Sequence, residues 1–186
     1  MRSDLPTEPA LAIPLREPCL VVLVGAAGSG KTTLAARLFA ADEVLSSDAY
    51  RARISGDETD QGVTRVAFRL LHRDLDRRLA AGLTTVVDAT NVTAFARRSL
   101  ARIAAVHGLP AVAIVLDPPS GLVLARNAAR PGRIVPEAAV RRQLADLERS
   151  LRRDQLAGEG FVAIHVLRDA SDLDAVEIAR GPRGAA

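Results

Sequence analysis

Short apolar runs rich in β-branched residues alternate, from Cys19 onward, with longer segments in which apolar residues recur every three or four positions. This alternation is typical of repeated strand–helix–strand units, which build a parallel sheet covered by helices on both faces. We expect five strands, at residues 20–24, 43–46, 85–88, 111–117 and 161–167. Helical patterns begin near Gly30, Gly62, Thr93, Ser120 and Pro136. The pattern therefore predicts an α/β sandwich of three layers with a mostly parallel five-stranded sheet.

The chain has 186 residues, enough to bury the core of one domain without disulfide bonds or a structural metal. We assign residues 19–170 to that domain. Residues 1–18 are interrupted by four prolines, and residues 171–186 end in a stretch rich in Gly, Pro and Ala. We therefore expect a flexible N-terminal extension at 1–18 and a C-terminal tail at 171–186.

Cysteine content and hydropathy indicate the compartment. Cys19 is the only cysteine, so it cannot form an intramolecular disulfide, and the N-terminal residues lack the apolar region of a signal peptide. The most apolar run, residues 19–27, is far shorter than the ~20 residues that a membrane span requires. We expect a cytoplasmic protein with no membrane partner.

The types and positions of the basic residues say more about function than the net charge does. A net charge of +3 is weak evidence for nucleic acid, but 24 of the basic residues are Arg and the single Lys is Lys31. Lys carries a compact ammonium on a flexible side chain, whereas Arg carries a planar guanidinium. The single Lys therefore marks a position where a compact cation is needed. Rows of Arg after Gly62 and after Pro136 are interpreted as solvated helix faces with acidic partners nearby. With four Phe, one Tyr and no Trp, any nucleic-acid contact must depend mainly on charge.

Residues 25–32 read GAAGSGKT, a full match to the phosphate-binding motif G-x-x-x-x-G-K-[ST] between an apolar run and a helical segment. Glycines let the backbone curl so that N–H groups point at phosphate oxygens, and the helix adds its positive N-terminal end. Lys31 would bridge the outer phosphates, and Thr32 would ligate Mg²⁺. We expect these residues to bind ATP or GTP: Gly25, Gly28, Ser29, Gly30, Lys31, Thr32 and Thr33.

The segment SSDAYR, residues 46–51, follows the second expected strand, at the end where parallel sheets bind their ligands. A carboxylate at Asp48 can accept the proton of an attacking hydroxyl, and Arg51 can hold an anionic group of the acceptor. In the alternative interpretation, Asp48 only caps a helix through Arg53. The spacing of these residues alone does not distinguish a catalytic Asp48 from a capping Asp48.

An acid also ends the third expected strand, in VVDATN at residues 86–91. In P-loop proteins, the Walker B acid lies at the end of a strand beside the phosphate-binding loop, and Asp88 has the same position in this sequence. We expect Asp88 to contact Mg²⁺ through water or to orient Asp48.

Arginines gather once more at residues 126–136, RNAARPGRIVP, before and within a loop broken by Pro and Gly. This loop joins two expected helices and is interpreted as a lid. Arginines brought over a transferring phosphoryl group stabilise the negative charge that spreads over it. The alternative is a solvated loop that is merely rich in Arg.

Five segments, in their order and spacing, resemble the kinase module of bacterial polynucleotide kinase-phosphatase end-healing enzymes: GAAGSGKTT, SSDAYR, GDETDQ, VVDATN and RNAARPGRIVPEAAVRRQ. The resemblance covers nearly all of residues 19–169. Its specificity lies in the combination, since small-molecule P-loop kinases reliably share only the first segment. It implies a P-loop kinase-type sandwich with a helical lid.

The resemblance also implies an activity, the Mg²⁺-dependent transfer of the γ-phosphate of ATP or GTP to 5′-OH ends of RNA or DNA. Lys31 would hold the donor phosphates, Asp48 would activate the 5′-hydroxyl, and Arg51 would bind the adjacent acceptor phosphate. Arg126 and Arg130 match the lid pair and would clamp the donor phosphates. Such modules commonly precede a phosphoesterase domain, and because this chain ends soon after its last strand, we expect no 3′-end processing by it.

Two other functions fit the same motifs. One is a small-molecule kinase in which Asp48 activates a sugar, nucleoside or antibiotic hydroxyl. The other is a regulatory module that binds NTP without a specific acceptor, since a phosphate-binding loop alone does not define a reaction. The sequence leaves open ATP against GTP, RNA against DNA, and the oligomeric state.

Overall fold

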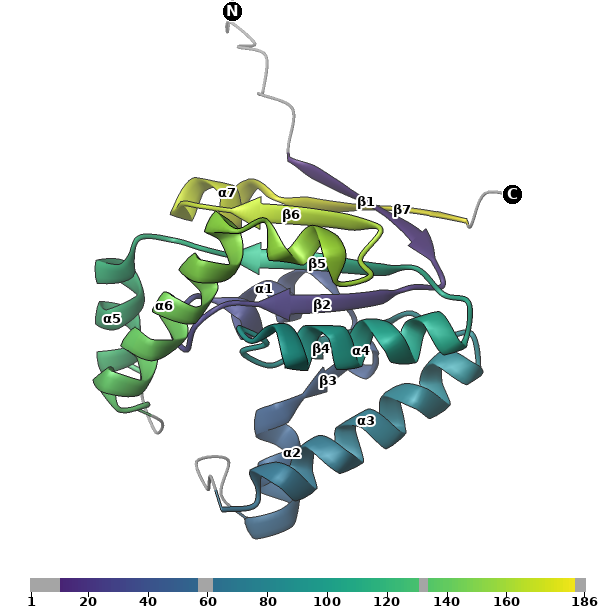
Figure 1. The fold of residues 1–186 in the computed structure, drawn as a ribbon, viewed down its shortest axis with the longest axis horizontal. Coiled ribbons are helices and arrows are strands. Elements are labelled where there is room, and N and C mark those ends of the chain that lie inside the picture. The colour runs from purple at the N-terminus through teal and green to yellow at the C-terminus, as the bar shows by residue number, and fades with distance from the viewer. Residues whose placement is uncertain (1–10, 57–61, 131–133, 183–186) are drawn as a thin grey trace, which may run out of the picture.

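The computed structural model describes residues 11–56, 62–130 and 134–182. Its main sheet has the strand order β3-β4-β2-β5-β6, and every neighbouring pair is parallel. The strands are β2 (Leu20–Val24), β3 (Val44–Ser46), β4 (Thr85–Asp88), β5 (Ala111–Leu116) and β6 (Ala163–Leu167). The prediction of an α/β fold with a five-stranded parallel sheet is confirmed (Figure 1).

Helices connect these strands in the order expected. The α-helices are α1 (Lys31–Leu38), α2 (Ser47–Ser55), α3 (Thr64–Ala80), α4 (Ala94–Val106), α5 (Ser120–Ala128), α6 (Glu137–Arg152) and α7 (Ala170–Ala175). Two 3₁₀ helices, η1 (Ala41–Glu43) and η2 (Gln155–Gly158), complete the described helices. Five α-helices begin within a few residues of their predicted starts, whereas α2 and α7 were not predicted.

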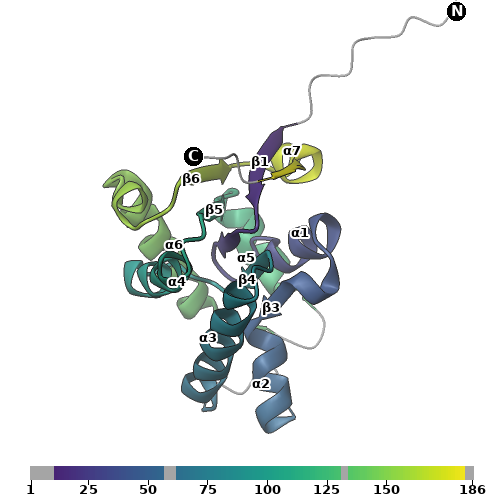
Figure 2. The same cartoon turned by 90° about the vertical axis from the view of Figure 1, so that its right-hand side faces the viewer.

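Apolar side chains of the sheet alternate between two cores. In β2, Leu20 and Val22 pack with residues of α3, α4 and α6 on one face, while Val21 and Leu23 pack with α1 on the other. Figure 2 shows α4 and α6 on one side of the sheet and α1 on the other. Because both faces are covered, the central strands can be apolar throughout, which is why they were recognisable in the sequence.

The predicted loose extensions differ from the structure at both ends of the domain. β1 (Ala12–Glu17) and β7 (Glu177–Pro182) pair in parallel and lie side by side in Figure 1. In β1, Ile13 and Leu15 are fully buried while Ala12, Pro14 and Arg16 are exposed, a period of two that marks a half-buried strand. Pro14 is tolerated because β1 has a strand partner on one side only.

Charged side chains fasten this two-stranded sheet to the domain. Arg180 of β7 donates to Glu17 Oε1 at 2.9 Å and to both carboxylate oxygens of Glu43, at 2.7 and 2.8 Å. These bonds hold the pKa of Glu43 below its ordinary value. Arg37 of α1 donates to the carbonyl of Val176 at 2.9 Å. Residues 12–17 and 170–182 are therefore part of the folded domain.

No helix among the described residues combines the length and the apolar character needed to cross a bilayer.

The strand register brings three strand ends together at one edge of the sheet. Asp88, the last residue of β4, is level with Leu23 of β2 on one side and with Ser46 of β3 on the other. The loop after β2 and the helix after β3 therefore start on either side of Asp88. Parallel sheets place their binding sites at this carboxyl edge.

Candidate functional site

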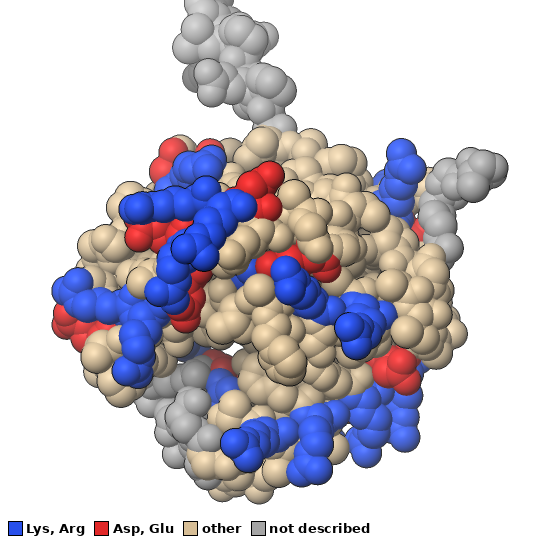
Figure 3. Space-filling model, in the orientation of Figure 1, with Lys and Arg blue, Asp and Glu red and all other residues tan. Residues whose placement is uncertain are grey.

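The carboxyl ends of β2, β3 and β4 open into a cleft of about 1010 Å³. Its mouth is a hollow between the helices α5 and α6 and the side of α2 (Figure 3). Most of the predicted site residues line it: Gly28, Gly30, Lys31, Thr32, Thr33, Asp48, Arg51, Asp88, Arg126 and Arg130. Gly25 and Ser29 are exceptions, since both lie within the loop rather than on the cleft wall.

The loop that joins β2 to α1 needs glycine at two positions. Gly28 has a φ of +88°, and a Cβ there would lie 2.5 Å from the carbonyl oxygen of Val123 in α5. Gly30, at φ +104°, precedes α1 in the left-handed region, where other residues are strained. No side chain caps the N-terminus of α1. The loop therefore presents the positive end of a helix to the cleft, which is the setting that phosphate groups require.

Lys31 lies inside this loop. Its Nζ donates to the carbonyl oxygens of Gly25 and Ala26 at 2.9 and 2.8 Å and lies 3.4 Å from Ser29 Oγ. Only 8% of the residue is exposed. Its ammonium is thus held at the centre of the phosphate-binding loop, where oxygens of a nucleotide can replace the neutral carbonyls as its acceptors.

Thr32 and Asp88 supply the oxygen atoms suited to Mg²⁺. Thr32 Oγ1 donates a 2.8 Å hydrogen bond to Asp88 Oδ2, which joins the first turn of α1 to the end of β4. Among the described residues, no three acidic, His or Cys side chains gather into a metal-binding cluster. A hydroxyl and one carboxylate nevertheless fit a Mg²⁺ that takes its remaining ligands from water and phosphate.

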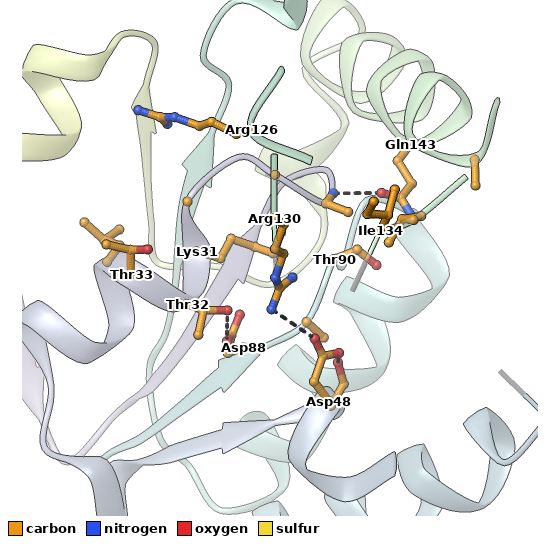
Figure 4. A pocket seen from close by; sticks show the side chains of 18 of the residues that line it. Lys31, Thr32, Thr33, Asp48, Asp88, Thr90, Arg126, Arg130, Ile134 and Gln143 are labelled. Carbon is orange, nitrogen blue, oxygen red and sulfur yellow. Dashed lines mark hydrogen bonds and ion pairs between the residues drawn. The ribbon is translucent and has the colours of Figure 1, made fainter. Parts of the chain in front are cut away.

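Asp48 lies in the first turn of α2, between two arginines. One carboxylate oxygen accepts a hydrogen bond from Arg51, and the other is 4.0 Å from Arg130 Nη2 (Figure 4). Arg51 is 4% exposed, so its charge is held in the wall of the cleft. The N-cap of α2 is Ser46, without a side-chain cap bond, so Asp48 is not the capping residue of the alternative interpretation. Arg53 lies over the Tyr50 ring at 5.5 Å. The contacts of Asp48 therefore face the cleft and not the outer surface of α2.

The two arginines expected to act as a lid pair point in different directions. Arg130 reaches toward Asp48, whereas Arg126 extends over the other side of the phosphate-binding loop (Figure 4). Arg126 Nη1 would lie 3.8 Å from a Cβ at Gly30. Arg133, which belongs to the same predicted cluster, lies outside the described residues. The arginines thus cover two separate parts of the cleft.

Two amides that hold the segment expected to form a lid were not singled out from the sequence. Gln143 of α6 accepts a 2.8 Å hydrogen bond from the backbone N–H of Ala27, which ties α6 to the phosphate-binding loop. Asn127 bonds both the carbonyl and the N–H of Val135, at 2.8 and 3.2 Å. Both amides fall in the quoted segment at residues 126–143, so the resemblance was the available signal.

A fully buried ion pair supports the loop after β4. Arg97 of α4 forms two bonds with Glu159, at 2.6 and 2.8 Å, and neither side chain is exposed. Its remaining donors bond the carbonyl oxygens of Asn91 and Val92 and the hydroxyl of Ser150. Arg97 thereby fixes the backbone just beyond Asp88 to α6 and to the segment before β6.

Replacing Glu159 by Gln is expected to lower the free energy of unfolding by about 3–5 kcal/mol, because Arg97 then keeps a buried charge without a carboxylate. Urea denaturation measures this loss. The matched control is Glu148→Gln, whose carboxylate pairs with Arg152 on the exposed face of α6. We expect the control to change stability by less than about 1 kcal/mol. Equal losses in the two variants would contradict a supporting role for the buried pair.

Comparison with known proteins relates this arrangement to nucleotide-binding folds. A family model described as AAA domain matches residues 20–152. A sugar kinase from Janibacter sp. HTCC2649 is 26% identical, with a TM-score of 0.55 over 81% of this chain and 84% of that one. Shikimate kinase from Acinetobacter baumannii is 24% identical, with a TM-score of 0.50 over 85% and 89%.

A further structural match is larger than this chain. A chain of the Pnkp1/Rnl/Hen1 RNA repair complex is 18% identical, with a TM-score of 0.62, and the match covers 82% of this chain and 49% of that one. This chain therefore corresponds to about half of that protein's length. No curated protein sequence matches the chain.

Proposed function

The chain belongs to the AAA domain family and forms a P-loop kinase-like domain, and from its site we propose that it is a polynucleotide 5′-hydroxyl kinase. In this proposal it transfers the γ-phosphate of ATP or GTP to 5′-OH ends of RNA or DNA. The observation that carries the proposal is the position of Asp48, held between Arg51 and Arg130 in the same cleft as Lys31.

A carboxylate in this position suits transfer to an alcohol. Asp48 accepts the proton of the 5′-hydroxyl as that oxygen bonds to the γ-phosphorus, and the bond from the γ-phosphorus to its bridging oxygen breaks to release NDP. Arg51, beside Asp48, holds the phosphate attached to the same nucleotide. Because Arg51 is almost fully buried, its contact with an anion is made away from bulk water, where it is strong.

The donor side is formed by the phosphate-binding loop and Arg126. Lys31 and the start of α1 hold the donor phosphates, while Thr32 and Asp88 hold Mg²⁺. When bound, the ion neutralises charge on the donor phosphates. Arg126 and Arg130 approach from α5 and its end, and they stabilise the negative charge of the transferring group.

A small-molecule kinase is the second candidate, and one comparison favours it. The sugar kinase that is 26% identical is matched over 84% of its length, whereas the RNA repair protein is matched over half of its own. In this alternative Asp48 activates the hydroxyl of a neutral metabolite. Arg51 then serves only to orient Asp48.

The dependence on an acceptor phosphate separates the two candidates. We expect a nucleoside 3′-monophosphate to be phosphorylated about 10- to 100-fold more efficiently than the nucleoside, because the charge-assisted contact with Arg51 is lost in the latter. Arg51→Gln should remove most of this preference. Arg53→Gln, on the same helix, should retain it, because Arg53 is stacked on Tyr50.

The measured quantity is the ratio of kcat/KM for the two acceptors, which is insensitive to a general loss of activity in a variant. Equal kcat/KM values for the nucleoside and its 3′-phosphate in the wild-type protein would instead favour the small-molecule kinase.

A further inference from the structure

Helix α3 carries a basic row that the proposed reaction does not yet use. Arg65, Arg69, Arg73 and Arg77 follow one another at four-residue spacing and are exposed, while the opposite face of α3 is buried in the core. Four residues advance an α-helix by about 6 Å, so the row runs along the helix. Figure 3 shows basic side chains gathered over α3, at the lower edge of the molecule.

The charge of this row is unevenly balanced. Arg73 and Arg77 share Asp74, at 3.3 and 3.8 Å. For Arg65 and Arg69, the structure shows no acidic partner within the described ranges 11–56, 62–130 and 134–182. Arg65 and Arg69, in the first two turns of α3, are therefore less balanced by acidic side chains of the described residues than Arg73 and Arg77 are.

Three arginines of helix α6 show what paired, solvated arginines look like in the same protein. Its Arg141, Arg149 and Arg152 each pair with an acid three or four residues earlier: Glu137, Asp146 and Glu148. Such pairs are the usual state of an exposed helix face and contribute little to binding or stability. Of the predicted α6 row, Arg149 pairs with Asp146, whereas Arg142 and Arg153 show no acidic partner within the described residues, as is also the case for Arg65 and Arg69 at the start of α3. The prediction of acidic partners therefore holds for only part of each row.

The start of α3 is also continuous with the cleft. Phe68 lines the cleft together with Asp48, and it lines a shallow hollow of about 570 Å³ with Arg65, Arg69 and His72. The ring of His72 meets Phe68 edge to face, with centroids 6.3 Å apart. Burial lowers the pKa of His72, so its ring adds no charge near pH 7. We call these four residues the α3 track.

We propose that the α3 track binds the single-stranded acceptor beyond its terminal nucleotide. Arg65 and Arg69 hold backbone phosphates, and Phe68 offers its ring to a base. Cations next to an aromatic ring, along a path out of a catalytic cleft, are the features with which proteins hold single strands without reading their sequence. This inference rests on the proposed function, since it assigns the path of the same acceptor.

Binding of an unreactive strand tests the track directly. The probe is a fluorescent single-stranded decamer that already carries a 5′-phosphate and so cannot accept another. In fluorescence anisotropy, Arg65→Gln/Arg69→Gln should raise its Kd at least about tenfold, and the slope of log K against log salt should fall by about 1.4. Arg149→Gln/Arg152→Gln on α6 removes the same charge and should leave both values unchanged.

Phe68→Leu supplies a second, uncharged variant. It keeps an apolar side chain against the core and removes the ring, so we expect a roughly 5- to 150-fold loss of decamer affinity. Equal affinities in wild type, the α3 variants and the α6 control would overturn the track. Equal losses in the α3 and α6 double variants, no decamer binding by the wild type, or equal competition by polyglutamate would overturn it as well.

Kinetics distinguish failure of the track from failure of the proposed function. If both hold, the α3 double variant raises the KM of a 5′-OH decamer far more than that of a nucleoside 3′-monophosphate. Equal KM changes for the two acceptors reject the track and keep the kinase. Decamer binding that depends on Arg65 and Arg69, without transfer to any 5′-OH acceptor, keeps the binding surface and rejects the kinase.

Discussion

Replacing Lys31 by alanine is expected to abolish measurable phosphoryl transfer, a loss of at least roughly 10³-fold. Lys31 is the only lysine of the chain, and its ammonium lies inside the phosphate-binding loop, 2.8–2.9 Å from two loop carbonyl oxygens. Without that charge the negative donor phosphates lose their main cationic partner in the loop. Transfer of label from γ-labelled NTP measures the effect.

The Lys31 variant needs a control for folding, because its ammonium also bridges the carbonyls of the loop. Thermal unfolding of the variant should remain cooperative. Arg141→Ala removes one cation from the exposed face of α6, where it pairs with Glu137, and should retain wild-type transfer. Turnover near wild type in Lys31→Ala would contradict the assignment of the phosphate-binding loop.

Replacing Asp48 by alanine is expected to lower turnover by about 10²- to 10⁴-fold, the usual contribution of a general base. Affinity for NTP should be retained, since Asp48 belongs to α2 and contacts Arg51 and Arg130 rather than the phosphate-binding loop. Equilibrium binding of a fluorescent NTP and steady-state transfer measure the two quantities separately.

Asp146→Ala is the matched control for Asp48→Ala. Asp146 pairs with Arg149 three residues later on α6, which repeats the helical geometry of Asp48 and Arg51 away from the cleft. It should leave turnover unchanged. A regulatory module that binds NTP without an acceptor predicts instead that neither substitution changes the function of the protein. Equal turnover in the two variants would therefore remove Asp48 from the reaction.

Elements with a strong local pattern were predictable from the sequence, and elements fixed by distant contacts were not. The strands β2 and β5 are continuous apolar runs and β4 is buried throughout, because helices cover both faces of the sheet. Helix α2 has the polar sequence SDAYRARIS and buries few residues, so its pattern was weak. β1 and β7 pair with each other across almost the whole chain. The alternation of buried and exposed residues in β1 is short and contains Pro14, so its local signal was weak.

In the candidate site, too, residues of local motifs were predictable and contacts between distant residues were not. Lys31, Thr32 and Asp88 belong to short motifs whose spacing is local, and the structure brings them into one cleft. The bond of Gln143 to the phosphate-binding loop spans 116 positions, so no local pattern could reveal it. The different directions of Arg126 and Arg130 likewise could not be read from their spacing in the sequence (Figure 4).

The identity of the acceptor is tested by following the label from γ-labelled ATP or GTP. The wild-type protein is incubated with Mg²⁺ and a panel of 5′-OH RNA and DNA oligonucleotides beside sugars, shikimate and nucleosides. A polynucleotide 5′-hydroxyl kinase places label on the 5′ ends of oligonucleotides, and we expect this label to be lost in Asp48→Ala. Label carried by a small molecule alone, or released only as free phosphate, would contradict the proposed activity.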